Sequence, residues 1–219
     1  VVQRVSYPVL SSIQSEPVRL REAYRRVIKL TMIVTFACML GLAAIAKPLI
    51  ILLIGEKWLP AVPFLQIICF SGMLYPLHAI NLNILQVKGR SDLYLKLEII
   101  KKIIAVITIF IGIFWGIECM LWGGVFVSFI SFFLNSYYSA DLIDYSTKNQ
   151  ISDIFPFLII SLIVSFCIWL ISFTEWSYII ILIIQIIVGI GLYWFISEKL
   201  PIQEYQEVRQ LVFSLFKKK

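Results

Sequence analysis

The sequence predicts an all-α, polytopic membrane protein. Hydrophobic residues make up 60% of the 219 residues, charged residues make up 15%, and the mean hydropathy is +0.92. A soluble domain has roughly 45–50% apolar and about 25% charged residues. The apolar residues gather in six runs, each close to the length of about 20 residues that a helix needs to cross a bilayer. We therefore predict six transmembrane helices.

The predicted spans follow one another with short connections. They cover residues 26–46, 64–86, 97–115, 119–139, 154–173 and 177–197. Pro48 interrupts the apolar run that continues from the first span, because proline cannot continue a helix without losing a hydrogen bond. Residues 49–54 are therefore expected to form a short second helix that ends at Gly55.

Basic residues predict how the chain is oriented and divided. All but two of the 19 Lys and Arg, the exceptions being Lys47 and Lys57, fall on one predicted side of the membrane. The positive-inside rule makes that side, with both termini, cytoplasmic. We predict these regions: 1–25, a cytoplasmic loop and helix; 26–140, four spans; 141–153, a cytoplasmic loop; 154–197, a final helix pair; and 198–219, a basic amphipathic tail on the anionic leaflet.

Composition excludes several classes of function. The net charge of +6 does not indicate nucleic-acid binding, because the basic residues lie beside apolar runs. The four cysteines occur singly, so neither a metal site nor a disulfide framework is predicted, and the chain offers one histidine and no paired acids. We predict no enzyme activity and no cofactor. The chain begins with Val1 and shows no signal peptide, so we expect a piece of a longer gene product.

The second predicted span carries an unusual set of polar residues. Ser71, Tyr75, His78 and Asn81 fall within about 120° of one another on a helix, next to Pro76. A polar group in hydrocarbon costs free energy, so these side chains predict either the wall of a polar cavity or pairing with neighbouring helices and with backbone freed by Pro76. A proton-coupling role for His78 is the weaker alternative.

The third span opens with basic residues. Arg90, Lys101 and Lys102 could attract a lipid-linked diphosphate at the cytoplasmic mouth of the cavity. The alternative is that they anchor and orient the helix at the interface. Glu98 can form an ion pair with either lysine at helical spacing.

The fourth span carries one stripe of small and polar residues. Their spacing of three or four residues predicts close helix packing, and cavity lining is the alternative, with Asn135 as its expected contact. The stripe consists of Gly124, Ser128, Ser131, Asn135 and Ser139. Weaker stripes in the last two spans predict peripheral packing helices.

Several stretches resemble polysaccharide exporters of the Wzx type, which belong to the multidrug/oligosaccharidyl-lipid/polysaccharide flippase superfamily. The resemblance is specific over about residues 1–140. The stretches are 7–14 (YPVLSSIQ), 20–26 (LREAYRR), 54–63 (IGEKWLPAVP), 75–83 (YPLHAINLN), 89–92 (GRSD) and 97–102 (LEIIKK).

The resemblance implies part of the C-terminal lobe and the final helix pair of a two-lobed flippase, with the N-terminal lobe missing. It implies transport of undecaprenyl-diphosphate-linked sugar repeat units across the bacterial inner membrane by alternating access, driven by an H⁺ or Na⁺ gradient. The implied partners are a lipid-linked oligosaccharide and membrane lipids. The candidate binding residues are Tyr75, His78, Asn81, Arg90, Lys101, Lys102 and Asn135. The alternatives are a multidrug or small-molecule exporter, which predicts an acid inside the cavity, and a non-catalytic membrane assembly subunit.

Overall fold

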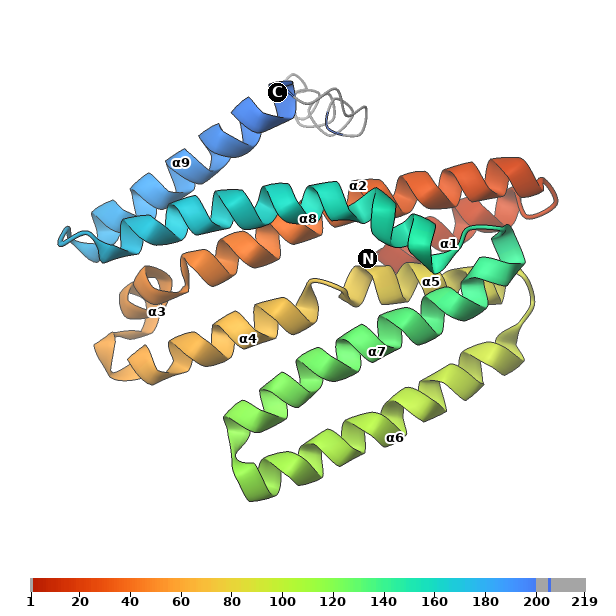
Figure 1. The fold of residues 1–219 in the computed structure, drawn as a ribbon, viewed down its shortest axis with the longest axis horizontal. Helices are drawn as coiled ribbons and strands as arrows, with labels where there is room; N and C mark the ends of the chain where they lie inside the picture. The colour runs from red at the N-terminus through yellow and green to blue at the C-terminus, as the bar shows by residue number, and fades with distance from the viewer. Residues whose placement is uncertain (1, 200–204, 206–219) are drawn as a thin grey trace.

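A computed structural model describes residues 2–199 and 205, and all the regular structure in that part of the chain is helical. The helices are α1 (Val2–Ser12), α2 (Pro17–Ala44), α3 (Ala46–Ile54), α4 (Val62–Gly72), α5 (Tyr75–Val87), α6 (Ser91–Trp115), α7 (Ile117–Ile143), α8 (Thr147–Leu170) and α9 (Tyr178–Lys199). Two short 3-10 helices, η1 (Glu56–Ala61) and η2 (Ile171–Phe173), complete the set (Figure 1). The predicted all-α, polytopic membrane fold is confirmed.

Five segments of the described chain are long and apolar enough to cross a bilayer. They are Pro17–Ala44, Glu56–Val87, Ile117–Ile143, Thr147–Phe173 and Tyr178–Ile196. The predicted third span, 97–115, lies in α6 and is not among the five. Helix α6 is about 37 Å long at 1.5 Å per residue, but Glu98, Lys101 and Lys102 divide it and leave only residues 103–115 uncharged.

Proline positions explain the two interrupted spans. Helix α2 stops at Ile45, and α3 begins at once with Pro48 in its first turn, where a missing N–H is not needed. The second predicted span, 64–86, is two helices that part at Met73 and Leu74. In a continuous helix Pro76 would meet the carbonyl of Gly72 without donating to it, so the chain starts a new helix at Tyr75.

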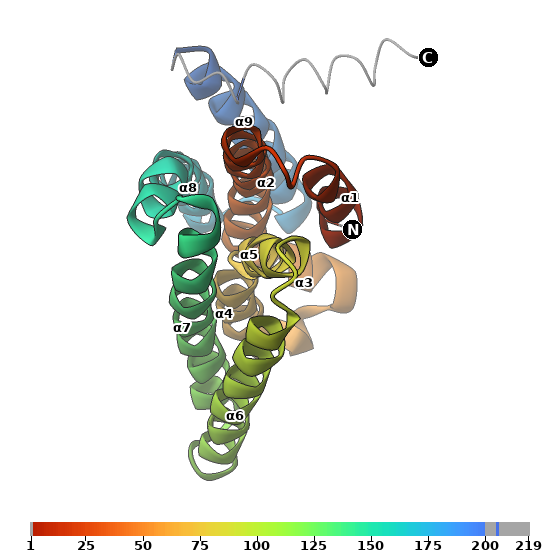
Figure 2. The same ribbon diagram turned by 90° about the vertical axis from the view of Figure 1, so that its right-hand side faces the viewer.

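The helices pack as two neighbouring groups. Helix α2 lies along α8, and α9 lies against α8 and α3, while α7 contacts α4, α5 and α6. Figure 2 shows α6 and α7 side by side at the edge farthest from α9. The tail predicted for 198–219 falls almost entirely outside the described residues.

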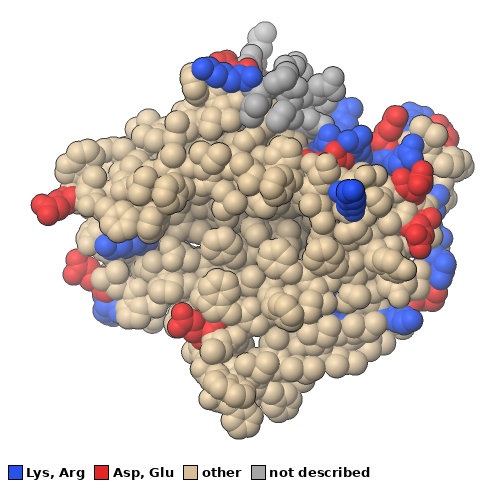
Figure 3. Space-filling model, in the orientation of Figure 1, with Lys and Arg blue, Asp and Glu red and all other residues tan. Residues whose placement is uncertain are grey.

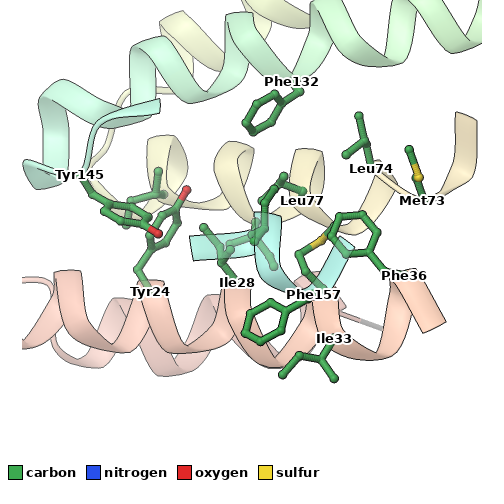
Figure 4. Packing of buried hydrophobic residues seen from close by; sticks show 14 of the residues in the cluster. Tyr24, Ile28, Ile33, Phe36, Met73, Leu74, Leu77, Phe132, Tyr145 and Phe157 are labelled. Atoms are coloured by element: carbon green, nitrogen blue, oxygen red, sulfur yellow. The ribbon is translucent and has the colours of Figure 1, made fainter. Parts of the chain in front are cut away.

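The main core joins α2, α5, α7 and α8. Tyr24, Phe36, Leu77 and Phe157 are almost fully buried in it (Figure 4). The rings of Tyr24 and Tyr145 meet edge to face, with centroids 6.0 Å apart. This core fixes the position of α5, from which the polar side chains of the candidate site extend.

Charged groups gather at the two ends of the helices and leave the face between them apolar (Figure 3). At one end, the carboxylate of Asp153 at the start of α8 accepts hydrogen bonds from Arg25 Nε at 2.5 Å and Arg25 Nη2 at 2.6 Å. The Tyr145 hydroxyl donates to the same carboxylate at 2.6 Å, and Lys29 Nζ lies 3.6 Å from it. These contacts tie α2 to α8. Burial raises the pKa of the Tyr145 hydroxyl above its usual range, and the hydrogen bond to Asp153 raises it further.

Candidate functional site

A groove lies between α5, α6 and α7, and we call it the α5–α7 groove. Its volume is about 370 Å³. It is lined by Tyr75, His78, Ala79, Leu82, Tyr94, Glu98, Lys101, Lys102, Ala105, Val127 and Ser131. A second hollow, of about 410 Å³, continues it toward α4 and shares Tyr75, His78, Val127 and Ser131 with it. Four of the predicted site residues therefore line one groove: Tyr75, His78, Lys101 and Lys102.

The imidazole of His78 is held against α7. Its Nε2 lies 3.0 Å from the Ser128 hydroxyl, which donates to the carbonyl oxygen of Ser71 at 3.0 Å. Ser71 in turn donates to the carbonyl oxygen of Gly124 at 3.4 Å. Small residues at these positions let α4, α5 and α7 approach closely enough for a histidine to bridge them.

The charged wall of the groove comes from α6. Lys101 Nζ donates to Glu98 Oε1 in an ion pair, and the Lys101 side chain is only 13% exposed. The helix begins at Ser91, so Lys101 lies about 15 Å along its axis. An ionised side chain at such a depth in a membrane segment usually faces a polar path or a partner.

Glu98 adds an acidic group to the groove. The sequence indicated Glu98 only as an ion-pair partner of a lysine, and in the structure it also lines the groove, one turn before Lys101. Tyr94, Glu98, Lys101 and Ala105 recur every three or four residues, which places them on one face of α6. The helical spacing could have predicted that Tyr94 and Glu98 share a face of α6 with Lys101. Only the fold shows that this face meets α5 and α7.

Tyr75 forms the open rim of the groove. Its side chain is 73% exposed, although it lines both hollows. An aromatic ring at an open rim offers an apolar face and a hydroxyl to a bound sugar or lipid.

Asn81 lies in the packed interior and does not line the groove. Its Oδ1 accepts from Tyr24 Oη at 2.6 Å, from Ser139 Oγ at 2.7 Å and from Gln150 Nε2 at 3.2 Å. Its Nδ2 donates to the carbonyl oxygen of Leu77 at 3.0 Å and to Gln150 Oε1 at 3.2 Å. Asn81 therefore cross-links α2, α5, α7 and α8.

The two other predicted site residues also lie outside the groove lining. Arg90 sits in the turn before α6, where its guanidinium donates to the Asp92 carboxylate at 3.0 Å. This bond holds the pKa of Asp92 below its usual range. Asn135 on α7 is fully buried, and neither atom of its amide group has a hydrogen-bond partner among the described residues.

The last two spans pack against each other and leave a hollow beside α2. Small side chains, including Gly41, Ser165 and Gly189, line a space of about 640 Å³ between α2, α8 and α9. Gln185 crosses one end of it and donates to the carbonyl oxygen of Ile168 and to Ser172 Oγ, both at 2.8 Å. In the described residues, no three His, Cys, Asp or Glu side chains gather as a metal site would require.

Comparison with known proteins finds similar sequences. A family model described as "Polysaccharide biosynthesis protein" matches residues 1–63. An uncharacterised membrane protein in the cps region of Klebsiella pneumoniae is 31% identical over 53% of this chain and 24% of its own length. The teichuronic acid biosynthesis protein TuaB of Bacillus subtilis is 27% identical over 73% of this chain and 33% of its own length.

A third relative, the lipopolysaccharide biosynthesis protein WzxC of Escherichia coli, is 29% identical over 51% of this chain and 23% of its own length. The chain thus spans between about a quarter and a third of the length of these relatives. No solved structure matches it. The matches confirm the resemblance seen in the sequence: over the part of their length that it spans, this multi-pass membrane chain is similar to Wzx-type polysaccharide biosynthesis proteins.

Proposed function

We propose that this chain is part of a flippase that carries undecaprenyl-diphosphate-linked oligosaccharide or polysaccharide repeat units across the bacterial inner membrane. Transport proceeds by alternating access, with an H⁺ or Na⁺ gradient as its energy source, and the chain catalyses no covalent reaction. The α5–α7 groove forms one wall of the path for the polar headgroup.

The observation that carries this proposal is the pair of lysines inside the groove. Lys101 and Lys102 line it together with His78 and the open ring of Tyr75. Two lysines and one glutamate leave the groove with a net positive charge, which suits an anionic headgroup such as a diphosphate. Tyr94 and Ser131 add hydroxyl groups of the kind that hydrogen-bond to sugars.

The charge balance of the groove argues against an exporter of cationic drugs. Such a protein needs an unpaired acid to attract its substrate, and Glu98 is paired with Lys101. The alternative of a passive assembly subunit does not account for a Lys101 side chain that lines a groove and is only 13% exposed.

A complementation assay tests the proposal. In a strain that lacks this protein, the whole protein carrying Lys101→Gln or Lys102→Gln should restore much less surface glycan than the wild type does. A charge-assisted hydrogen bond is worth about 1.5–3 kcal/mol, so each substitution should weaken headgroup binding about 10- to 100-fold.

Two matched controls accompany the assay. Arg90→Gln removes a basic side chain from the turn between α5 and α6, outside the groove lining. Lys57→Gln removes a basic side chain from η1, which does not line the groove. Both should restore the glycan if they reach the membrane in normal amounts. Full surface glycan from the Lys101 and Lys102 variants would refute the proposed role of the groove.

A further inference from the structure

The hollow between α2, α8 and α9 is bordered by a polar atom that has no partner. Gln185 on α9 lines the hollow and is fully buried. Its Nε2 donates to the carbonyl oxygen of Ile168 and to Ser172 Oγ, but its Oε1 has no hydrogen-bond partner among the described residues. A buried amide oxygen without a donor has lost the hydrogen bonds that it makes in water, so this atom calls for an explanation.

The rest of the hollow is apolar or already hydrogen-bonded. At the end opposite Gln185, the hydroxyl groups of Ser161 and Tyr193 lie 2.9 Å apart and pair with each other. Between the two ends the lining consists of small and aliphatic side chains, with Gly41 and Gly189 among them. None of the described residues that line the hollow is charged. A charged headgroup would therefore be buried there without a counter-ion, which excludes a diphosphate.

The dimensions of the hollow suit one flexible chain. Gln185 and Tyr193 are separated by about 12 Å along the axis of α9. A helix with its side chains is about 10–12 Å across, so a 12 Å length of helix occupies roughly 900–1,400 Å³. The hollow holds about 640 Å³. It is too small for a helix of a partner protein and large enough for an apolar chain.

The hollow reaches the surface that faces the membrane. Ile186 and Ile190 line it, and their side chains are 45% and 66% exposed. Phe173 and Trp176 are exposed in the turn before α9, where aromatic side chains mark the interface of the bilayer. Gln185 lies about 10 Å along α9 from its start. A ligand can therefore enter from the lipid phase, with its polar group held near that interface.

We propose that this hollow binds a lipid alcohol, a neutral molecule with one hydroxyl group on an apolar chain, and that the hydroxyl donates to Gln185 Oε1. The chain lies along Gly41, Val164 and Gly189. A hydrocarbon tail alone, whether acyl or isoprenoid, would fill the same space and leave Oε1 unpaired. The hollow shares no lining residue with the α5–α7 groove, and the inference does not depend on the proposed function.

A native cysteine reports on occupancy of the hollow. Cys38 lines it and is exposed, so a bound chain should shield its thiol. We would prepare the 219-residue chain in lipid nanodiscs with Cys69, Cys119 and Cys167 replaced by serine, and measure the rate of alkylation by N-ethylmaleimide. The probes are decanol and decane at equal mole fraction in the membrane. We expect decanol to bind about 2- to 10-fold more tightly than decane, as one neutral hydrogen bond allows. A chain that retains only Cys119, outside the hollow lining, corrects for effects of the probes on the membrane.

Variants separate recognition of the hydroxyl from the shape of the hollow. Gln185→Leu should reduce the protection by decanol to the level of decane or below, and should leave the protection by decane unchanged. Gly41→Leu places a side chain in the open space of the hollow and should abolish protection by both probes. Gly191→Leu is the matched control, because Gly191 also has nothing within 4 Å but lies outside the hollow lining. It should leave both effects as in the wild type.

Two results with the wild type alone would overturn the inference, even if the variants failed to fold. Equal protection by decanol and decane would describe an acyl-chain pocket that does not recognise a hydroxyl group. Protection of Cys38 no greater than that of Cys119 would show that neither probe occupies the hollow. Decanol that protects the Gln185→Leu variant as well as the wild type would remove Oε1 from the site. The glycan assay with Lys101→Gln decides the proposed function separately.

Discussion

Single residues show how the same polar chemistry serves two purposes in this chain. Asn81 and His78 are one turn apart on α5, and both carry hydrogen-bonding side chains into an apolar environment. Asn81 meets Tyr24, Ser139 and Gln150 in the interior, whereas His78 meets Ser128 at the wall of a groove. The first arrangement stabilises the fold, and the second leaves Nδ1 of the ring buried without a hydrogen-bond partner among the described residues.

Replacement of Asn81 tests the stabilising role. Asn81→Leu leaves the hydroxyls of Tyr24 and Ser139 and the amide of Gln150 without their shared acceptor. We expect it to lower the free energy of unfolding by roughly 1–3 kcal/mol, measured by loss of helical circular dichroism in a denaturing detergent series. Tyr24→Phe, which removes one donor and leaves the others paired, should cost about 1 kcal/mol. Equal stability of Asn81→Leu and the wild type would contradict the cross-linking role.

At the scale of elements, glycine and proline set several of the helix boundaries. Gly55 and Gly116 have φ of 94° with ψ of 164° and 169°, a backbone conformation that side chains with a Cβ avoid. Gly116 lets α6 turn directly into α7 and so brings the charged wall of the groove against His78. Pro76 separates α4 from α5 in a similar way and sets the direction of the helix that carries Tyr75 and His78.

Gly116→Ala should weaken the α6–α7 hairpin although nothing lies within 4 Å of the added methyl group. The cost is conformational, about 1–3 kcal/mol, and thermal unfolding in nanodiscs measures it. Gly41→Ala is the matched control, because Gly41 also has open space around it but lies inside α2. There the substitution should be neutral or stabilise the helix by about 0.5–1 kcal/mol. If Gly41→Ala were the less stable of the two variants, the backbone conformation at residue 116 would not be what requires glycine there.

For the whole molecule, charged residues cluster at the two ends of the helices. The turn between α5 and α6 approaches the turn between α1 and α2, where Lys88 Nζ donates to the carbonyl oxygen of Gln14 at 3.2 Å. Arg21 and Asp144 meet at the same end, 2.7 Å apart. The positive-inside rule predicts that this end faces the cytoplasm.

Cysteine labelling tests that orientation. In a variant whose native cysteines, Cys38, Cys69, Cys119 and Cys167, are replaced by serine, Asp144→Cys should react with a membrane-impermeant thiol reagent only in inside-out vesicles. Glu175→Cys, in the turn after η2 at the other end of α8, should react in spheroplasts. The opposite pattern would invert the proposed topology and place the basic end outside.

Part of the candidate site could be predicted from the sequence. Tyr75, His78, Lys101 and Lys102 are polar or basic residues in or beside apolar runs, and all four line the groove. Asn81 and Arg90 met the same criterion and lie elsewhere. A hydrogen-bonding side chain in an apolar run must have a partner, but its sequence position does not say whether the partner is another helix, a neighbouring carboxylate or a ligand.

The sequence by itself determined that the chain is helical and crosses a membrane several times, because hydropathy and local spacing are properties of neighbouring residues. Its matching stretches carried the resemblance to polysaccharide biosynthesis proteins. Only the tertiary structure decided which face of α6 meets α5 and α7, and so which lysines share a groove with the histidine. It also decided that Asn81 is enclosed by three other helices. These outcomes depend on contacts between residues about 20 to 70 positions apart, and such contacts arise from packing rather than from any local pattern.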